Sequence, residues 1–175
     1  MRKYIPFLAL WLLLVGGCGY HFTGEGTTPR PGLKSVAIPV FEDDSGFPGA
    51  ASLFAGALRQ EFLTKGLLQV VPVDQAEAVF KGRIINIYTS AVAHRAPQQT
   101  VLTRMFVVLN IKCTDRRTGA IIWQQPNFTY YTDYLNSPNP EAPDPITTYD
   151  NKIDALQFLA NQMATRIHDR FMTAF

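Results

Sequence analysis

TVLTRMFVVLNIKCT, at residues 100–114, alternates in side-chain character with a period of two, which is the period of a β-strand. The first set of alternate positions is mainly apolar, and we assign it to the core: Val101, Thr103, Met105, Val107, Leu109, Ile111 and Cys113. The opposite set mixes polar side chains with Phe106 and Val108. The stretch therefore predicts a strand with one buried face and one face of mixed chemistry.

Further strands are predicted on both sides of this stretch. Residues 79–93 form the run before it. The run after it begins beyond the loop DRRTG at 115–119, whose final glycine is typical of a hairpin. It comprises residues 120–125 and 127–135, and Pro126 between them predicts a bulge or bend.

Two shorter strands are expected nearer the N-terminus, at residues 34–41 and 67–73. Pro39 removes a hydrogen-bond donor from the first of them. That strand therefore either lies at an edge of the sheet or stops early.

Two amphipathic helices complete the pattern. Residues 50–65 carry apolar side chains at helical spacing, and Gly66 stands where a left-handed cap belongs. Residues 149–171 form a second apolar stripe at steps of three and four. These elements predict an α+β, two-layer sandwich, in which two helices pack on one face of a mainly antiparallel sheet of four to five strands.

Residues 1–17 have the form of a secretory signal peptide: a basic start, a short apolar run and small residues before the break. The apolar run is too short to span a bilayer, which takes about 20 residues. The sequence VGGC at 15–18 resembles the bacterial lipobox, in which Cys18 would receive lipid and become the first mature residue. The alternative is an ordinary secretory signal followed by a chance cysteine. Gly19 in place of aspartate resembles the sorting signal for the outer membrane.

The remaining chain divides into a lipidated N-terminus and tether at 18–32 and a single domain at 33–175. Removal of Arg2 and Lys3 with the signal peptide leaves 14 basic and 14 acidic side chains. This balance gives no overall attraction for nucleic acid, so an anionic ligand would need a local basic patch. Cys113, the one other cysteine, is expected to be a buried and inert thiol.

The sequence contains no recognisable catalytic constellation. The three histidines, His21, His94 and His168, lack metal-ligand spacing, and neither a Gly-x-Ser-x-Gly elbow nor a phosphate-binding glycine loop occurs. The acidic residues 42–44 are more typical of a solvated turn than of a metal site. We expect His168 on the exposed side of the last helix. The protein is therefore predicted to be no enzyme and to need no cofactor or metal.

Several local patterns occur in a characteristic order along the chain. They are CGYHF at 18–22, IPVFE at 38–42, AEAVFKGRI at 76–84, DRRTGAIIW at 115–123 and the amphipathic C-terminal helix. Together they resemble the LptE family of lipopolysaccharide-assembly lipoproteins over nearly the whole mature chain.

The resemblance implies two helices packed on a sheet and a periplasm-facing lipoprotein of the outer membrane. It also implies a partner, the outer-membrane β-barrel LptD, whose lumen such a lipoprotein occupies as a plug, and binding of lipopolysaccharide during insertion into the outer leaflet. Only the lipidated Cys18 is carried over from the family. The basic residues and the Pro-rich loop at 137–145 depart from the enterobacterial members.

The sequence FTYYTDY at 128–134 is a candidate barrel contact, because tyrosine offers a large contact area with a polar tip. Tyr131 and Tyr134 are the residues proposed for this contact. The alternative is that Phe128, Tyr130 and Tyr134, which share one face, pack in the core.

Basic side chains are candidates for the phosphates and sugar acids of lipopolysaccharide, since they form charge-assisted hydrogen bonds with anions. The candidates are Arg104 and Lys112 on the mixed strand face, Arg116 and Arg117 at the hairpin tip, and, as weaker ones, Arg83 and Arg95. The alternative for each is an ordinary solvated charge. The competing function is a different periplasm-facing lipoprotein that acts as an envelope scaffold or enzyme activator.

Overall fold

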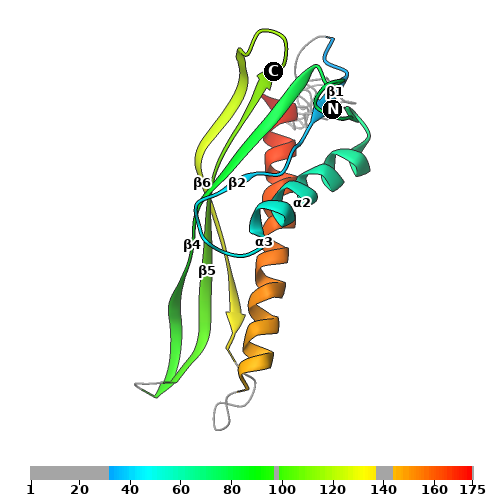
Figure 1. The fold of residues 1–175 in the computed structure, drawn as a ribbon. Coiled ribbons are helices and arrows are strands. Elements are labelled where there is room, and N and C mark those ends of the chain that lie inside the picture. The colour runs from blue at the N-terminus through cyan, green and yellow to red at the C-terminus, as the bar shows by residue number, and fades with distance from the viewer. Residues whose placement is uncertain (1–31, 97–98, 137–143, 175) are drawn as a thin grey trace, which may run out of the picture.

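The computed structural model describes residues 32–96, 99–136 and 144–174 of the 175-residue chain. Three long strands dominate the fold: β4 (Ala78–Ala96), β5 (Gln99–Asp115) and β6 (Ile121–Leu135). β5 lies between the other two and pairs antiparallel with both (Figure 1). The predicted alternating strand is thus the centre of the antiparallel part of the sheet.

Three short strands extend the sheet beside β4: β1 (Ser35–Ala37), β2 (Glu42–Asp43) and β3 (Gln69–Val70). All of their pairings are parallel, which gives the order β3-β1-β4-β5-β6, with β2 also paired to β4. β1 ends two residues before Pro39 and has a neighbour on each side. Of the two expectations for this strand, early termination is the correct one.

The bulge predicted at Pro126 is present in β6. The register with β5 skips between the pairs Leu109↔Phe128 and Ile111↔Gln125. Asn127 has a φ of 48° at this point, and its N–H donates to the side chain of Asn110. Proline cannot donate to the ladder, so the strand accommodates it by an irregularity.

The first helix, α2 (Ala50–Lys65), has the predicted bounds. It ends because Gly66 adopts a φ of 67° and donates its N–H to the Phe62 carbonyl at 3.1 Å. The left-handed conformation carries no steric cost for glycine, which explains the cap.

The last helix, α3 (Pro145–Thr173), begins four residues before its predicted start. Pro145 is tolerated in the first turn because no intrahelical N–H bond is needed there. The carboxylate of Asp144 accepts the Thr147 hydroxyl at 2.6 Å and the Ile146 N–H at 3.0 Å. These bonds stabilise the charged form and lower the pKa of Asp144.

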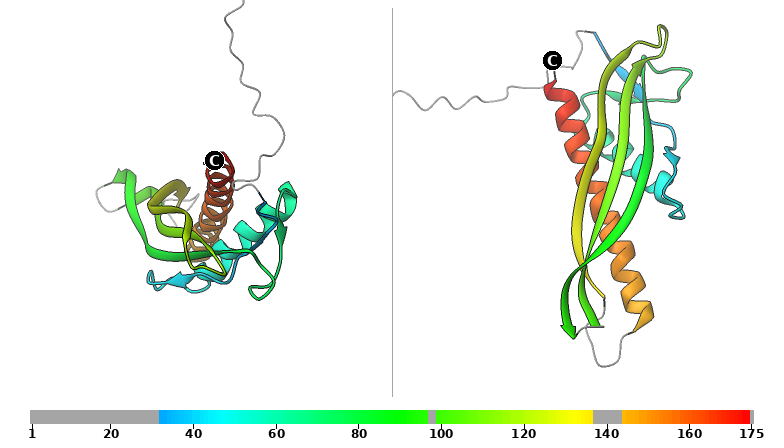
Figure 2. Two further views of the ribbon diagram at one scale, coloured as in Figure 1. Left: turned by 90° about the horizontal axis from the view of Figure 1, so that it is seen from above. Right: turned by 90° about the vertical axis from the view of Figure 1, so that its left-hand side faces the viewer.

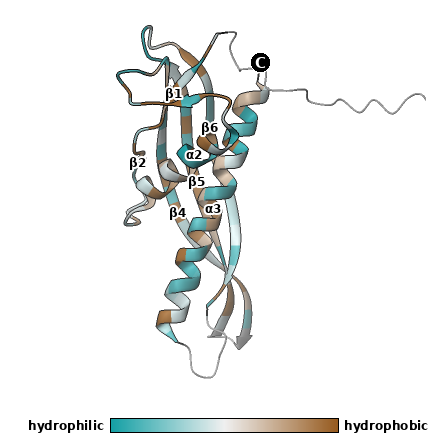
Figure 3. Cartoon of the chain, turned by 90° about the vertical axis from the view of Figure 1, so that its right-hand side faces the viewer, coloured by the Kyte–Doolittle hydropathy of each residue, from teal (hydrophilic) through white to brown (hydrophobic). Residues whose placement is uncertain are grey.

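Both helices cover the same face of the sheet, and α3 runs alongside the long strands (Figure 2). Hydrophilic and hydrophobic residues alternate along α3, as an amphipathic helix requires (Figure 3). The predicted core face of β5 is buried from Thr103 to Cys113. The α+β sandwich expected from the sequence is therefore confirmed. None of the helices in the described ranges has the length and apolar character to cross a membrane.

An aromatic cluster joins the two layers of the domain. The Phe80 ring of β4 lies 5.2 Å from Phe62 on α2 and 4.9 Å from Phe171 on α3. His168 packs edge-on against Phe62 and is only 3 % exposed. The expectation that His168 faces solvent is therefore wrong: in the 29-residue helix, this position points at the junction with α2.

Candidate functional site

The side of β4, β5 and β6 that faces away from α2 and α3 is here called the open face. The mixed set of β5 side chains lies on it, including Arg104, Phe106 and Lys112. In Figure 2 the sheet stands in front of α3 when viewed from this side. Strand alternation therefore separates the side chains of β5 into a packed set and an accessible set.

Three rings form a row across the open face, one from each long strand. Tyr88 and Tyr131 are the register partners of Phe106. The Tyr88 and Phe106 rings are stacked, with centroids 4.8 Å apart and an interplanar angle of 9°, and Phe106 and Tyr131 are 5.6 Å apart. Tyr88 is 43 % exposed and Tyr131 50 % exposed. This aromatic row presents large rings to solvent on a rigid sheet.

Arg104 lies beside the aromatic row in a doubly bonded ion pair. Its Nε donates to Asp133 Oδ1 at 2.6 Å, and its second guanidinium nitrogen donates to Oδ2 at 2.8 Å. The guanidinium also lies over the Tyr131 ring, 4.3 Å from the centroid. Hydrogen bonding within the pair raises the pKa of Arg104 and lowers that of Asp133. The pair holds the guanidinium over an exposed ring.

Tyr134 is on the opposite side of β6 from Tyr131. Its ring packs against the core, as does that of Tyr130, while Phe128 is fully within the core. Burial is the main cause that raises the pKa of Tyr134. The two tyrosines proposed as barrel contacts are therefore separated, and the core alternative describes Tyr134.

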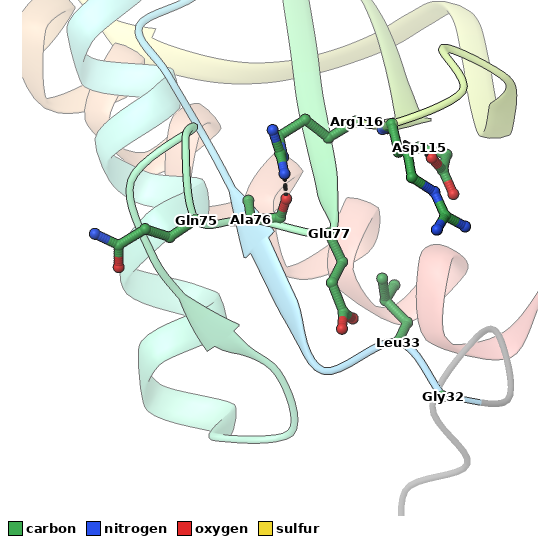
Figure 4. A pocket seen from close by; sticks show the side chains of 8 residues that line it. Gly32, Leu33, Gln75, Ala76, Glu77, Asp115 and Arg116 are labelled. Atoms are coloured by element: carbon green, nitrogen blue, oxygen red, sulfur yellow. Dashed lines mark hydrogen bonds between the residues drawn. The ribbon is translucent and has the colours of Figure 1, made fainter.

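The hairpin-tip arginines line a hollow of about 380 Å³ at the end of the domain where the described chain begins (Figure 4). Arg116 Nε donates to the carbonyl of Ala76 at 2.7 Å, and its backbone N–H donates to Glu77. Arg116 thus fastens the hairpin to the loop before β4. The Arg117 side chain is exposed, and its backbone N–H donates to the Asp115 carboxylate at 2.9 Å.

The remaining candidate cations differ in their surroundings. Arg83 is paired with Glu42 at 3.0 Å and with Asp44 at 3.3 Å, which accounts for two members of the acidic turn. Lys112 is exposed on the open face and directly opposite Lys81. Cys18 and the side chain of Arg95 lie outside the described residues.

Cys113 is buried among core side chains, as expected. Burial raises the pKa of its thiol to about 12, which keeps it protonated at neutral pH. Within residues 32–96, 99–136 and 144–174, no three metal-ligating side chains gather closely enough to hold an ion.

The sequence did not indicate the aromatic row as a unit, because its three rings come from separate strands. The alternation predicts Phe106 on the mixed face, but no local pattern links it to Tyr88 or links Arg104 to Asp133. Only the register of β4, β5 and β6 shows that Tyr88, Phe106 and Tyr131 align. Regular counting from the pair Thr114↔Ile121 beside the hairpin would place Phe106 opposite Thr129, so the two register shifts between β5 and β6 must be known before Tyr131 is found beside Phe106.

Solved structures share this fold at low sequence identity. Protein XCC0632 from Xanthomonas campestris matches at a TM-score of 0.51 and 12% identity, over 84% of this chain and 92% of that chain. A chain described as a candidate lipoprotein from Caulobacter crescentus matches at 0.50 and 13%, over 77% and 89%. A minor lipoprotein from Acinetobacter baumannii matches at 0.47 and 13%, over 81% and 94%. At these identities the first two matches, with TM-scores of 0.51 and 0.50, show the fold alone.

No curated protein matches the chain. The family model of LptE, described as lipopolysaccharide-assembly, matches residues 33–171. The match spans the sheet, both helices and the open face. It begins just after the tether expected at 18–32. This chain therefore belongs to the LptE lipopolysaccharide-assembly family.

Proposed function

We propose that this chain is an outer-membrane lipoprotein that plugs an LptD-like β-barrel, supports its assembly, and binds lipopolysaccharide during insertion into the outer leaflet. Membership of the LptE family gives the chain a role in lipopolysaccharide assembly and makes it a non-enzymatic envelope lipoprotein. The proposal adds the barrel partner, the lipid ligand and the anchor on Cys18, through which the domain faces the periplasm.

The aromatic row on the open face is the observation that carries the proposal. Tyr88, Phe106 and Tyr131 present a row of contacting rings that neither α2 nor α3 covers, although a soluble single-domain protein rarely exposes a contiguous apolar patch. Two of the three rings end in a hydroxyl. Such rings suit contact with a surface that is polar in part, as the lumen wall of a barrel is.

The Arg104–Asp133 pair makes this contact specific. The pair neutralises both charges, so the row can be covered by a partner without leaving an uncompensated ion. The planar guanidinium over Tyr131 also adds flat contact area. Arginine and tyrosine together are the residue types enriched where interfaces carry most of their binding energy.

Capture of the barrel tests this assignment. Tyr131→Glu places a charge in the aromatic row and is expected to reduce co-purification of a large outer-membrane β-barrel at least tenfold. Tyr149→Glu is the matched control, because Tyr149 is 62 % exposed but lies on α3. Both variants must retain the melting temperature of the wild type. Undiminished capture by Tyr131→Glu would contradict the proposal, and recovery of a cell-wall synthase instead would favour the envelope scaffold.

Lipopolysaccharide binding is tested at Arg117. The Arg117 side chain is exposed at the hairpin tip, whereas Arg116 fastens the hairpin to Ala76 and is expected to matter for folding. Arg117→Ala should therefore lower lipopolysaccharide binding by the purified chain without lowering its melting temperature. Unchanged binding in this variant would remove the hairpin tip from the ligand surface.

The anchor is tested by Cys18→Ala. The variant is expected to leave the outer-membrane fraction, because two or more acyl chains are needed for stable anchoring and the alanine can carry none. Fractionation of the envelope and mass measurement of the mature N-terminus read out the result. Retention of unlipidated protein in the outer membrane would show that the barrel alone holds it there.

A further inference from the structure

Two lysines face each other across the open face, far from the aromatic row. Lys81 on β4 and Lys112 on β5 are direct register partners, and both side chains are exposed. Side chains opposite each other on antiparallel strands have Cβ atoms about 4.5–5.5 Å apart. Like charges at this separation destabilise a sheet, so the arrangement is unfavourable without a ligand.

The two ammonium groups also lack acidic partners among the described residues. Arg83, two residues along β4, is held between Glu42 and Asp44. No described carboxylate lies within ion-pair distance of Lys81 or Lys112. The local charge therefore stays positive: Lys81, Lys112 and Arg83 carry three positive charges, and Glu42 and Asp44 carry two negative ones.

The lysines line a hollow of about 500 Å³ that also contains amide groups. Gln124, the register partner of Lys112 on β6, is exposed in its wall. Asn110 lies in the same wall, and its Oδ1 accepts the N–H of Asn127 at 2.7 Å. This bond leaves the amide nitrogen of Asn110 as the group that can donate to a ligand. The bulge at Pro126 and Asn127 forms one border of the hollow.

We propose that the hollow between Lys81 and Lys112 binds a phosphate group, either as inorganic phosphate or as the phosphate of a phosphorylated lipid. A phosphate monoester carries about −1.5 to −2 charges at neutral pH, which matches two ammonium groups. Its several acceptor oxygens match the amide donors of Asn110 and Gln124. Glu42 also lines the hollow and pairs with Arg83 at 3.0 Å, but Arg83 is shared with Asp44 at 3.3 Å, so these three side chains together keep one negative charge.

This site is independent of the proposed barrel contact. Lys112 is eight residues beyond Arg104 on the same strand, which is about 27 Å at 3.4 Å per residue. The phosphate site is defined by its own residues and needs no barrel. Failure of the barrel-capture experiment therefore leaves it unaffected, and its own failure leaves the barrel contact unaffected.

Thermal melting and phosphate titration of the purified full chain test the site. Inorganic phosphate, compared with chloride at equal ionic strength, is expected to raise the melting temperature, because a ligand that binds only the native state stabilises it. Lys81→Gln and Lys112→Gln should each weaken phosphate binding about tenfold, the value of one charge-assisted hydrogen bond. The double variant should lose the response. In phosphate-free buffer each single variant should melt slightly higher than the wild type, because the like-charge pair is gone.

Lys152→Gln is the control, since Lys152 is on α3 and its ammonium lies over the Phe47 ring. It should keep the full phosphate response. Phosphatidylcholine vesicles with and without phosphatidic acid then distinguish the two sources. Binding only to phosphatidic acid vesicles, lost in the double variant, identifies a lipid phosphate, whereas a response to inorganic phosphate alone identifies the free anion. Equal responses by the wild type and the double variant, or no response by the wild type to either probe, would overturn the proposal.

Discussion

The two faces of the long sheet both carry clustered aromatic rings, but they use them differently. On the packed face, Phe80 is fully buried and contacts Phe62, Phe171 and Trp123. On the open face, the Phe106 ring contacts the rings of Tyr88 and Tyr131, and both of these are exposed. The first cluster joins two helices to a sheet, whereas the second joins three strands and then ends at solvent.

This difference in burial indicates which cluster stabilises the fold and which can contribute to the binding of a partner. Burial of the Phe80 ring is complete in the folded chain, so its contribution appears in folding. The aromatic row keeps part of its apolar area in water, so that part becomes available only when something covers it. Variants on the two faces should therefore separate stability from binding.

The largest effect on stability is expected from Phe80→Ala. It removes a ring with 0 % exposure from the junction of α2, α3 and the sheet. Large-to-small changes of this kind cost about 3–5 kcal/mol, because a cavity remains. Urea denaturation of the purified chain would measure the loss in the free energy of unfolding.

Phe106→Ala is the matched control on the other face. It removes the same ring from the aromatic row, where each ring–ring pair contributes about 0.5–1.5 kcal/mol. The expected loss of stability is thus well below that of Phe80→Ala, while barrel capture should fall. Equal losses of stability for the two variants would refute the separation of the faces.

Overpacking of the packed face should produce the next effect, at Gly82. A Cβ at this position would lie 2.6 Å from two atoms of the Phe41 ring, which occupies the space beside the strand. Gly82→Ala is therefore expected to cost about 1–3 kcal/mol. Phe41→Leu should relieve part of this cost in the double variant, and strictly additive losses would show that the two residues do not compete for space.

Sequence patterns predicted the helices and strands of this fold better than they predicted which strands pair with one another. The helix at 50–65 was predictable because an apolar stripe ends at Gly66, and β5 because its alternation is local. The parallel pairing of β1, β2 and β3 depends on contacts between segments far apart in sequence.

The site was predictable only in part, for the same reason. The residue types of Arg104 and Tyr131 predict each as a candidate contact, whereas the contact between them depends on the register of β5 and β6. The sequence predicts Arg116 as a cation at the hairpin tip, but its hydrogen bond to the Ala76 carbonyl, 40 residues away, could not be predicted from the local pattern. The prediction that His168 is exposed is wrong because it rests on the neighbouring arginines, which are typical of an exposed helix face. Its burial depends instead on the packing of α2 against α3, where it contacts Phe62.

Substitution of His168 is expected to change stability less than the core variants do, and to raise it rather than lower it. Its Nδ1 is 3.1 Å from Asp169, but Nε2 is buried without a hydrogen-bond partner in the described residues. A buried polar group without a partner costs about 1–3 kcal/mol. His168→Leu should therefore leave stability unchanged or raise it by about 1 kcal/mol, the remainder being offset by imperfect packing against Phe62.

Chemical denaturation of His168→Leu beside Asp169→Asn would check this expectation. Asp169→Asn weakens the Nδ1 contact and leaves Nε2 untouched, so it should not stabilise the chain. A clear loss of stability in His168→Leu would mean that the imidazole makes a favourable contact that the leucine cannot replace.

The smallest effect is expected at Asp133, on the open face. The hydrogen bonds from Arg104 lower the pKa of Asp133 in the folded chain below its ordinary value of 3.8. The ion pair therefore stabilises the fold fully at pH values above 3.8, and this contribution is lost as the pH falls through the lowered pKa. Asp133→Asn should thus be slightly less stable than the wild type at pH 7, and the difference should disappear in acid. Melting curves across this range would show it, and a difference that grows in acid would contradict it. Exposed ion pairs contribute little to folding. A strong loss of barrel capture in the same variant would therefore mean that the pair serves chiefly to hold Arg104 over Tyr131 for a partner.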